Sequence, residues 1–464
     1  MTIKFGTDGW RGVIADDFTF ENLGKVALAT AKYFQNHANA GNGIVIGYDS
    51  RFLSKEFAER SAQVVAGVGL KVLLADSIVP TPGVSLAIKQ LKAAGGVVIT
   101  ASHNPSKYNG FKIKGSYGGP AHPEMVSRVE EILRPLLGKS PAVELQPMAV
   151  LEEKGLVERV DLRKLYVDDL KQKLDLGLIK KAGIKIVYDV MHGAGMNIME
   201  RLLPDVRQIR NSYNPSFGQS NPEPLEQNLQ ELIETIRSAD YDLGIATDGD
   251  ADRIGAVDEK GSFVDSHRIF ALLLKYFVEV KKWSGEVAKS FTVTEMVNKQ
   301  CEKYALKLHV TPVGFKHICR LMTERDILIG GEESGGLGVK GHIPERDGIY
   351  LGLLLAEIMA VRKKRMSELV QELMDELGEH HFQRVDRHIT PEQKDETMSR
   401  FKKGLSSIGG YKVVRVETID GFKYFIDKGW LLVRPSGTEP LVRFYAEADT
   451  PSKVKQLLAA ATEI

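Results

Sequence analysis

The chain has 464 residues, 43% hydrophobic and 27% charged, a composition typical of a globular protein long enough for three or four domains. Its 62 basic and 61 acidic residues leave a net charge of +1, which gives no reason to expect a nucleic-acid or anionic-membrane partner. The two cysteines, Cys301 and Cys319, are too few for a disulfide framework or a zinc knuckle. The N-terminus is glycine-rich and no apolar run reaches the length of a membrane span, so we expect a cytoplasmic protein.

Short β-branched runs that end in glycine- or aspartate-rich loops recur along the chain. They are too short for buried helices and predict interior strands. Amphipathic helical patterns, such as those of residues 18–37 and 267–283, lie between them. The alternation predicts α/β layers with ligand loops at the carboxyl ends of the strands. The strand-and-loop segments are residues 43–51, 95–105, 184–195, 241–253 and 326–336.

The last part of the chain has a different pattern. Helices there are combined with close-set strands in residues 412–426 and 429–448, which predicts an antiparallel α+β unit. A polar, proline-bearing stretch at residues 137–147 indicates the end of the first domain. We therefore expect α/β domains at residues 1–145, 155–257 and 258–368 and a smaller α+β domain at residues 369–464.

The first loop that can carry chemistry is TASHNPSKYNGFKI, at residues 100–113. Ser102 follows an apolar strand, and the turn made by His103, Asn104 and Pro105 would project its hydroxyl into a cleft, as a nucleophile requires. A polar turn with a capping serine explains the same residues equally well. No G-x-S-x-G elbow is present, so a Ser-His-Asp triad has no support.

The second loop is DGDADR, which follows the strand LGIAT. Asp248, Asp250 and Asp252 alternate, and three hard oxygen ligands suit Mg²⁺. A calcium EF-hand, in which Glu259 would be the twelfth residue, is excluded because Arg253 stands where that loop needs glycine and a strand precedes it. Arg253 would instead hold a phosphate near the metal. A solvated acidic turn is the weaker alternative.

The third loop is GGEESGG, at residues 330–336. Its glycines let the backbone approach a ligand closely, while Glu332 and Ser334 can hydrogen-bond the vicinal hydroxyls of a sugar. Taken alone, the segment is weak support for a ligand site, because glycine-rich turns with a polar tip are often only turns.

The fourth loop is RPSGTEP. Arg434 can bind a phosphate through two nitrogen atoms, and Ser436, Gly437 and Thr438 can donate hydroxyl and backbone hydrogen bonds to it. The loop lacks the G-x-x-x-x-G-K-[ST] pattern of a Walker motif. Taken alone, it is explained more simply as a hairpin turn.

Together the four loops describe phosphoryl transfer on a phosphosugar, because a nucleophile, a metal site, a sugar-binding loop and a phosphate-binding loop occur one per domain. The motifs FGTDGWRG, TASHNP, DGDADR, GEES and RPSGTEP also follow the order found in the α-D-phosphohexomutase superfamily, which the chain resembles along essentially its whole length. This superfamily includes phosphoglucomutases, phosphomannomutases and phosphoglucosamine mutases. The resemblance implies three α/β domains with mixed sheets and a smaller C-terminal α+β domain around a central active-site cleft.

The resemblance also implies catalytic roles. Ser102 would carry the transferable phosphate and, with the three aspartates of DGDADR, hold Mg²⁺. Lys112 would be the general acid/base, with its pKa depressed by the metal and nearby arginines. Arg11 would contact the phosphoserine region. The phosphoserine would phosphorylate a hexose monophosphate, and the resulting glucose 1,6-bisphosphate would turn over in the cleft before returning its other phosphate.

The same resemblance places a second group of residues at the substrate. Glu332 and Ser334 would contact O3 and O4, where glucose and mannose are alike, and the fourth loop would hold the non-reacting phosphate. The full group is Arg253, Gly314, Lys316, Glu332, Ser334, Arg346, Arg434, Ser436, Gly437 and Thr438.

The sugar specificity is predicted from the stretch GEESGGLGVKGHIPERDG, which is most similar to phosphoglucomutases. It departs from them at Arg346, where they have lysine, and in TPVGFKH, where Val313 and Phe315 replace commoner polar residues. Gly336 replaces a histidine frequent in bifunctional mannose/glucose and glucosamine enzymes, and FGTDGW also differs from the FGTDGI of the glucosamine enzymes. We predict a phosphoglucomutase that interconverts glucose 1-phosphate and glucose 6-phosphate. The alternatives are a phosphomannomutase, a bifunctional phosphomannomutase/phosphoglucomutase and, less favoured, a phosphoglucosamine mutase.

Two other classes of protein share some of these features. A metal-dependent phosphatase would have to admit water to the phosphoserine, whereas four loops closing one cleft argue for its exclusion. A phosphosugar sensor has no need of Ser102 and Lys112 together with a metal site.

Overall fold

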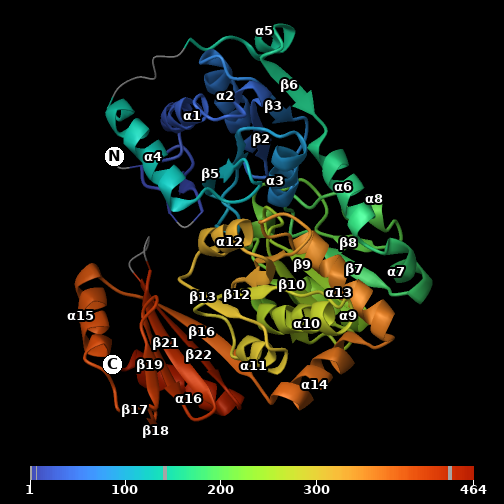
Figure 1. Cartoon of the computed structure of the whole chain (residues 1–464), viewed down its shortest axis with the longest axis vertical. Helices are drawn as coiled ribbons and strands as arrows, with labels where there is room; N and C mark the ends of the chain where they lie inside the picture. Colours follow the sequence, from blue (N-terminus) through green and yellow to red (C-terminus); the bar gives the residue numbers. More distant parts are fainter. Residues whose placement is uncertain (1–2, 7, 139–143, 437–440) are drawn as a thin grey trace.

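The computed structural model describes residues 3–6, 8–138, 144–436 and 441–464, and these form four consecutive units, each built on one main sheet (Figure 1). The three α/β sheets and the antiparallel C-terminal sheet confirm the predicted fold class. No helix within the described ranges combines the length and the apolar character that crossing a membrane requires.

The first unit is a six-stranded mixed sheet. Its strands lie in the order β1 (Trp10–Val13), β5 (Tyr108–Gly115), β4 (Gly95–Ile99), β2 (Ile44–Tyr48), β3 (Val72–Ala75) and β6 (Val157–Val160). Its helices are α1 (Phe20–Phe34), α2 (Ser54–Gly67), α3 (Thr81–Gln90), α4 (Pro123–Leu133) and α5 (Met148–Glu153). β5 runs antiparallel to β4, so that Lys112 pairs with Val98 and returns to the strand end that precedes Ser102.

Helices cover both faces of this sheet, and β4 shows why its sequence begins with two glycines. A Cβ on Gly95 would lie 2.4 Å from the Phe34 ring of α1, and one on Gly96 would lie 2.6 Å from Ile88 of α3. Successive strand residues point to opposite faces, so each glycine lets one helix pack closely.

The second and third units are smaller mixed sheets. The second has the order β11 (Phe263–Val264), β10 (Ile254–Asp258), β9 (Leu243–Thr247), β7 (Ile186–Asp189) and β8 (Arg207–Ile209). The third has the order β13 (Leu308–Thr311), β12 (Glu286–Ser290), β14 (Ile327–Gly331) and β15 (Leu337–Val339). Their helices are α6 (Leu162–Lys173), α7 (Leu176–Ala182), α8 (Met199–Leu202), α9 (Gln230–Ser238), α10 (Ser266–Glu279), α11 (Met296–Lys303), α12 (Phe315–Glu324), α13 (Gly348–Arg362) and α14 (Met366–Leu377).

The second and third units share one hydrophobic core. Helix α13 is apolar nearly all round and buried along almost its whole length. It packs against β9, β10 and α7 of the second unit and against α10 of the third. A helix without a polar face must be covered on every side, and here two units supply the cover.

Two edge strands lie beyond the expected domain boundaries. β6 pairs with β3 of the first sheet although its residues were predicted in the second domain, and β11 pairs with β10 although its residues were predicted in the third. Both strands are short, and β6, with the sequence VERV, has no apolar run from which a strand could be predicted. The four predicted domain ranges themselves stay predictions.

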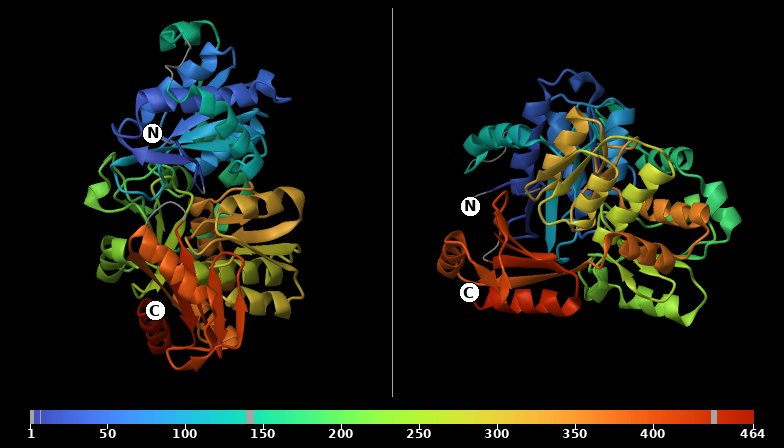
Figure 2. Two further views of the ribbon diagram at one scale, coloured as in Figure 1. Left: turned by 90° about the vertical axis from the view of Figure 1, so that its left-hand side faces the viewer. Right: turned by 60° about the horizontal axis from the view of Figure 1, so that its bottom comes forward.

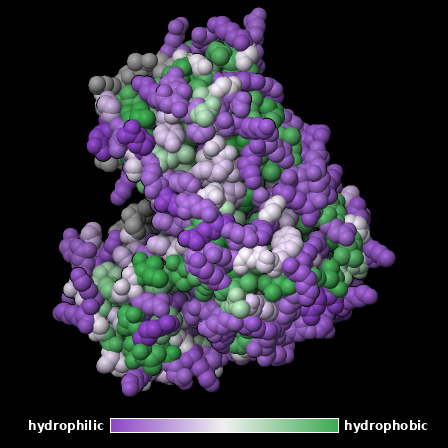
Figure 3. All heavy atoms as spheres, viewed as in Figure 1, coloured by the Kyte–Doolittle hydropathy of each residue, from purple (hydrophilic) through white to green (hydrophobic). Residues whose placement is uncertain are grey.

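The C-terminal unit is an antiparallel sheet with a separate core. Its order is β16 (His381–His388), β22 (Leu441–Ala448), β21 (Gly429–Pro435), β20 (Phe422–Ile426) and β19 (Arg415–Glu417). The remaining elements are α15 (Pro391–Lys402), α16 (Pro451–Thr462), and the hairpin of β17 (Ser407–Ile408) and β18 (Tyr411–Lys412). In the left view of Figure 2 the unit lies below the first unit and in front of part of the second and third, and Figure 3 shows the surface hollowed between it and the first unit.

Candidate active site

Ser102 lies at the point where the loops of the first and second units meet. It is fully buried and has a φ of 53°, a left-handed conformation that non-glycine residues rarely adopt. Its N–H donates to Oγ1 of Thr100 at 2.9 Å, and its hydroxyl donates to Oδ2 of Asp248 at 2.7 Å. The strained turn therefore aims the hydroxyl at the DGDADR loop that follows β9.

The three aspartates of that loop form a buried cluster that fits Mg²⁺. One carboxylate oxygen from each of Asp248, Asp250 and Asp252 lies within 4.8 Å of the others. Oδ1 of Asp250 and Oδ1 of Asp252 are buried and have no hydrogen-bond partner among the described residues. Burial and the two neighbouring carboxylates raise the pKa of Asp248 well above its ordinary value. The three carboxylates are hard oxygen donors that repel one another, and a bound magnesium ion would offset this repulsion.

Lys112 places a positive charge directly against this cluster. Its Nζ lies 2.7 Å from Oδ2 of Asp250, and 3.1 Å from the Oδ2 atoms of Asp252 and Asp8. Burial alone would lower the pKa of Lys112, but without a bound cation these carboxylates outweigh it and raise the pKa, because the three acids face the ammonium directly. The depressed pKa expected from the sequence refers to the site with Mg²⁺ bound and stays a prediction. A cation bound by the aspartates would take up part of that negative charge.

Arg346 joins the third unit to the same acids. Its Nη2 lies 2.7 Å from Oδ2 of Asp252 and 2.5 Å from Oδ2 of Asp8. Its guanidinium also lies over the Phe315 ring at the start of α12, 5.3 Å from the centroid, so two residues that depart from the expected motifs contact each other. Asp8, in FGTDGW, is a residue that sequence reasoning missed.

Two further arginines place positive charge beside the TASHNP turn. Nη1 of Arg11 donates to Oδ1 of Asn104 at 2.6 Å, and Nε of Arg253 lies 3.9 Å from Oδ2 of Asp248. Burial, followed by these two guanidinium groups, holds the pKa of His103 well below its usual range. His103 is therefore neutral, and the positive potential around Ser102 is suited to a phosphate.

Arg51 lies behind the Ser102 turn and was also missed. The guanidinium is buried and donates four hydrogen bonds of 2.6–3.0 Å to backbone carbonyls, while its Nε lies 3.2 Å from Oδ2 of Asp49. The carbonyls belong to Ser102, Asn104, Pro105 and Tyr108. The signal was the D-x-R that directly follows β2, in the same strand-end position as the other functional loops.

The proposed sugar loop contacts the start of α12. Oε1 of Glu332 accepts a hydrogen bond from the N–H of Gly314 at 2.8 Å, and burial raises the pKa of Glu332. Ser334 and Lys316 are both half-buried. The structure therefore brings together the two segments to which a sugar-binding role was assigned.

The C-terminal unit reaches this region through Asp420. Its Oδ2 accepts hydrogen bonds from Nε of Arg434 at 2.8 Å and from the N–H of Val313 at 2.9 Å. Ser436 is buried and lies at the end of β21. Gly437 and Thr438, the other two predicted ligands in this loop, lie outside the described residues. Arg434 thus belongs to the sugar-loop region, not to the ion-pair network around Ser102.

The comparisons agree with this arrangement over the whole chain. Residues 2–136, 164–261 and 265–377 match phosphoglucomutase/phosphomannomutase alpha/beta/alpha domains I, II and III, and residues 389–464 match the C-terminal domain of the same family. A phosphoglucomutase/phosphomannomutase of Thermococcus kodakarensis is 31% identical over 458 residues, which cover 98% of this chain and 96% of that protein. A phosphoglucosamine mutase of Carboxydothermus hydrogenoformans is 32% identical over 457 residues, 96% and 94% of the two chains. A crystal structure of a proposed phosphomannomutase from Thermus thermophilus superposes with a TM-score of 0.88 at 36% identity, covering 100% of this chain and 99% of that one.

The chain therefore belongs to the phosphoglucomutase/phosphomannomutase family of the α-D-phosphohexomutase superfamily. It is a phosphohexomutase, an enzyme of the isomerase class that acts on phosphosugars. This excludes the phosphatase and the inactive sensor.

Removal of the metal should abolish activity. We expect EDTA to stop turnover and added Mg²⁺ to restore it, because the aspartates would lose the cation that offsets their charge. Asp252→Asn should lower kcat by about 10²-fold or more while the protein stays folded. The measurement is a coupled mutase assay with circular dichroism of each variant.

The control for this prediction is Glu259→Gln. The side chain of Glu259 accepts hydrogen bonds from Ser367 and takes no part in the aspartate cluster. This variant should keep nearly full activity. Full activity after chelation would contradict the metal site.

Arg51→Lys should lower kcat with little change in KM. Lysine keeps the charge beside Asp49 but cannot donate to four carbonyls, so the Ser102 turn loses its fixed geometry. Misplacement of a reacting group by about 1 Å costs on the order of 10²-fold. The matched control is Arg128→Lys, since Arg128 makes an exposed ion pair with Glu131. Equal loss in kcat/KM through KM alone would show that Arg51 does not position the turn.

Proposed function

We propose that this phosphohexomutase is a phosphoglucomutase that interconverts glucose 1-phosphate and glucose 6-phosphate through a phosphoserine at Ser102. The observation that carries the proposal is the 2.7 Å contact between Oγ of Ser102 and Asp248 inside the aspartate cluster. A nucleophile held against a divalent-cation site, with Arg11 and Arg253 close by, is the arrangement that phosphoryl transfer needs.

Phosphoryl transfer breaks the bond between phosphorus and Oγ of Ser102 and forms a bond to a hydroxyl oxygen of the hexose monophosphate. Mg²⁺ held by phospho-Ser102 and the three aspartates would neutralise the negative charge on the transferred group. Arg11 and Arg253 supply further positive charge at this point. The product of the first step is glucose 1,6-bisphosphate, whose other phosphate returns to Ser102 after the sugar turns over in the cleft.

Each half-reaction also moves one proton, and Lys112 is the residue we assign to it. The attacking hydroxyl must lose a proton, and the serine oxygen released in the first step must gain one. Lys112 lies against Asp250 and Asp252, on the part of β5 that returns beside the Ser102 loop. Its pKa falls towards the working range when the negative charge of those aspartates is offset.

The remaining groups hold the parts of the substrate that do not react. Glu332 and Ser334 are suited to the O3 and O4 hydroxyls, and Arg434 to the distal phosphate. The bisphosphate must bind in two orientations, so these contacts cannot depend on which phosphate is at Ser102. The other groups assigned to the substrate are Gly314, Lys316, Arg346, Ser436, Gly437 and Thr438.

Ser102 should carry the phosphate in the purified enzyme. Intact-mass analysis and peptide mapping should place one phosphate there, and Ser102→Ala should lower kcat by about 10³-fold or more, because the covalent route is lost. Ser106, in the same loop and half-buried, is the matched control, and Ser106→Ala should stay active. A phosphate found only elsewhere, or an active Ser102→Ala enzyme, would refute the mechanism.

Glucose phosphate should be the best substrate, followed by mannose phosphate. A site that contacts O3 and O4 but makes little contact at C2 discriminates by about 1–3 kcal/mol, or roughly 10- to 200-fold in kcat/KM. Galactose phosphate, which differs at C4, should be rejected more strongly. The measurement is kcat/KM for the three 1-phosphates and for glucosamine 1-phosphate. Mannose or glucosamine preferred by tenfold or more would overturn the choice of sugar and leave the phosphoserine mechanism standing.

A further inference from the structure

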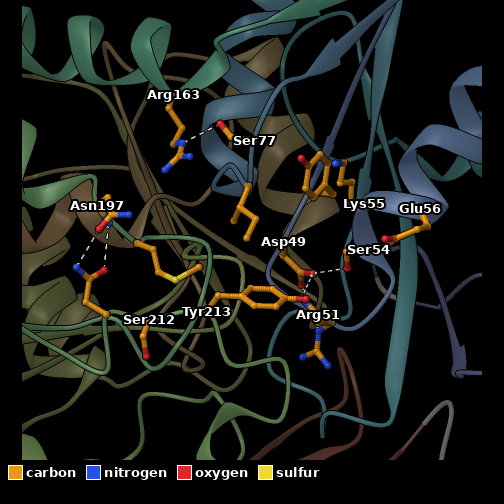
Figure 4. A pocket seen from close by; sticks show the side chains of 14 residues that line it. Asp49, Arg51, Ser54, Lys55, Glu56, Ser77, Arg163, Asn197, Ser212 and Tyr213 are labelled. Atoms are coloured by element: carbon orange, nitrogen blue, oxygen red, sulfur yellow. Dashed lines mark hydrogen bonds and ion pairs between the residues drawn. The ribbon is translucent and has the colours of Figure 1, made fainter. Parts of the chain in front are cut away.

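A cavity of about 440 Å³ lies between the first and second units (Figure 4). Apart from Asp49 and Arg51, no residue discussed above in the active site lines it. Its volume lies within the range of small-molecule sites, roughly 300–1,000 Å³. It is thus a separate space, distinct from the phosphosugar cleft.

The cavity is located where α/β sheets bind ligands. Tyr48 is the last residue of β2, and Ser77 and Ile78 follow the end of β3. From the second unit, Asn197 lies in the loop that follows β7, and Tyr213 in the loop that follows β8. The carboxyl ends of four strands from two sheets therefore meet around it, and ligands of α/β proteins bind at such strand ends.

The walls of the cavity combine apolar surface with a few directed polar groups. Tyr48, Ile78, Met196 and Tyr213 supply the apolar part, and the ring of Tyr213 extends into the space in Figure 4 with 61% of the residue exposed. An exposed tyrosine over a cavity offers a flat surface for a planar ring. The ligand is therefore expected to contain a ring.

The polar groups indicate the rest of the ligand. Asn197 and Asn211 both line the cavity, and Nδ2 of Asn211 donates a 3.1 Å hydrogen bond to Oδ1 of Asn197, which leaves the side-chain amide nitrogen of Asn197 available to a ligand. Arg163 of α6 and Lys55 of α2 add two positive charges, against one negative charge from Glu56, while Asp49 and Arg51 offset each other. This excess of positive charge favours an anion.

The inner wall connects the cavity to the catalytic serine. Arg51 lines it and, on its other side, holds the backbone carbonyls of the Ser102 turn. Asp49 pairs with Arg51 and accepts a hydrogen bond from Ser54 at 2.8 Å, and both residues also line the cavity. A molecule bound here contacts the groups that fix Ser102 without touching Ser102 itself.

We propose that this cavity is a second binding site, for a small planar-ring compound with one anionic group, and that its occupancy changes phosphoryl transfer at Ser102 through Asp49 and Arg51. A nucleoside monophosphate and an aromatic carboxylate share this chemistry. Binding at one site that alters turnover at another requires a physical link between them, and Arg51 is that link.

Binding is tested by calorimetry with adenosine monophosphate, adenosine and 4-hydroxybenzoate on the full chain. The site predicts that at least one of the two anions, adenosine monophosphate and 4-hydroxybenzoate, binds. If adenosine monophosphate binds, adenosine, which lacks the phosphate, should bind at least tenfold more weakly. Arg163→Gln and Tyr213→Ala should each weaken binding of the anion by tenfold or more, whereas the exposed control Arg128→Gln should not. If neither anion binds, or if Arg163→Gln leaves the affinity unchanged, the proposal is wrong.

The link to Ser102 is tested by mutase kinetics at saturating glucose 1-phosphate with the probe that binds. We expect kcat to change by at least twofold in the wild type and not in Arg163→Gln, which lies outside the phosphosugar site and keeps its basal activity. An effect on KM alone that persists in Arg163→Gln would mean that the probe competes in the active site, and would overturn the proposal. Binding without any change in kcat would overturn the link to Ser102.

Discussion

The structure depends on the compensation of buried negative charge at the DGDADR loop. Three carboxylates taken out of water are strongly destabilising unless cations and hydrogen bonds compensate them. The second unit contributes Arg253, whose Nε lies 3.9 Å from Oδ2 of Asp248. Lys112 comes from the first unit and Arg346 from the third, and each lies within 3.1 Å of an aspartate oxygen. These ion pairs join the loops of the three units, and the candidate active site lies where those loops meet.

A second constraint acts on Ser102, the proposed nucleophile. The left-handed backbone of Ser102 is unfavourable for a residue with a Cβ, and such strain persists only where the surroundings fix it. Arg51 provides that fixation with donors on both terminal nitrogens, and Asp49 offsets its charge. A rigid turn of this kind would suit the proposed phosphoserine mechanism, in which Ser102 must return to the same position after each half-reaction.

Much of this architecture could be predicted from the sequence. The strand-and-loop segments were predicted correctly because interior strands are short, β-branched and followed by glycine or aspartate, and the predicted segments contain β2, β4, β7, β9 and β14. The edge strands β6 and β11 were not assigned to their sheets, since pairing at an edge leaves no periodic pattern in a strand of two to four residues.

The candidate site residues were predicted from motifs, but the motifs do not show which residues interact with them. Arg51 and Asp8 were missed because no local pattern records their partners, which are distant in the sequence. Arg51 binds a set of backbone carbonyls, and Asp8 pairs with three cations. Without a bound cation the pKa of Lys112 is raised by three acids that come from two different units, an arrangement that no local pattern records either. The spacing of residues within a loop predicts which side chains can bind a metal or substrate. Their protonation depends on the charged side chains that other loops place beside them.

The shared core of the second and third units limits how this protein can be recombined. Helix α13 is covered partly by β9 and β10 and partly by α10, so neither unit buries it alone. A chimera that exchanges only the second unit with a relative would place foreign side chains against α13. The C-terminal unit has a core of its own that includes Phe401, Leu431 and Phe444, and its hydrophobic contact with the third unit is a smaller, separate cluster around Phe291. Chimeras of this chain should therefore exchange three blocks: the first unit, the second and third units as one block, and the C-terminal unit.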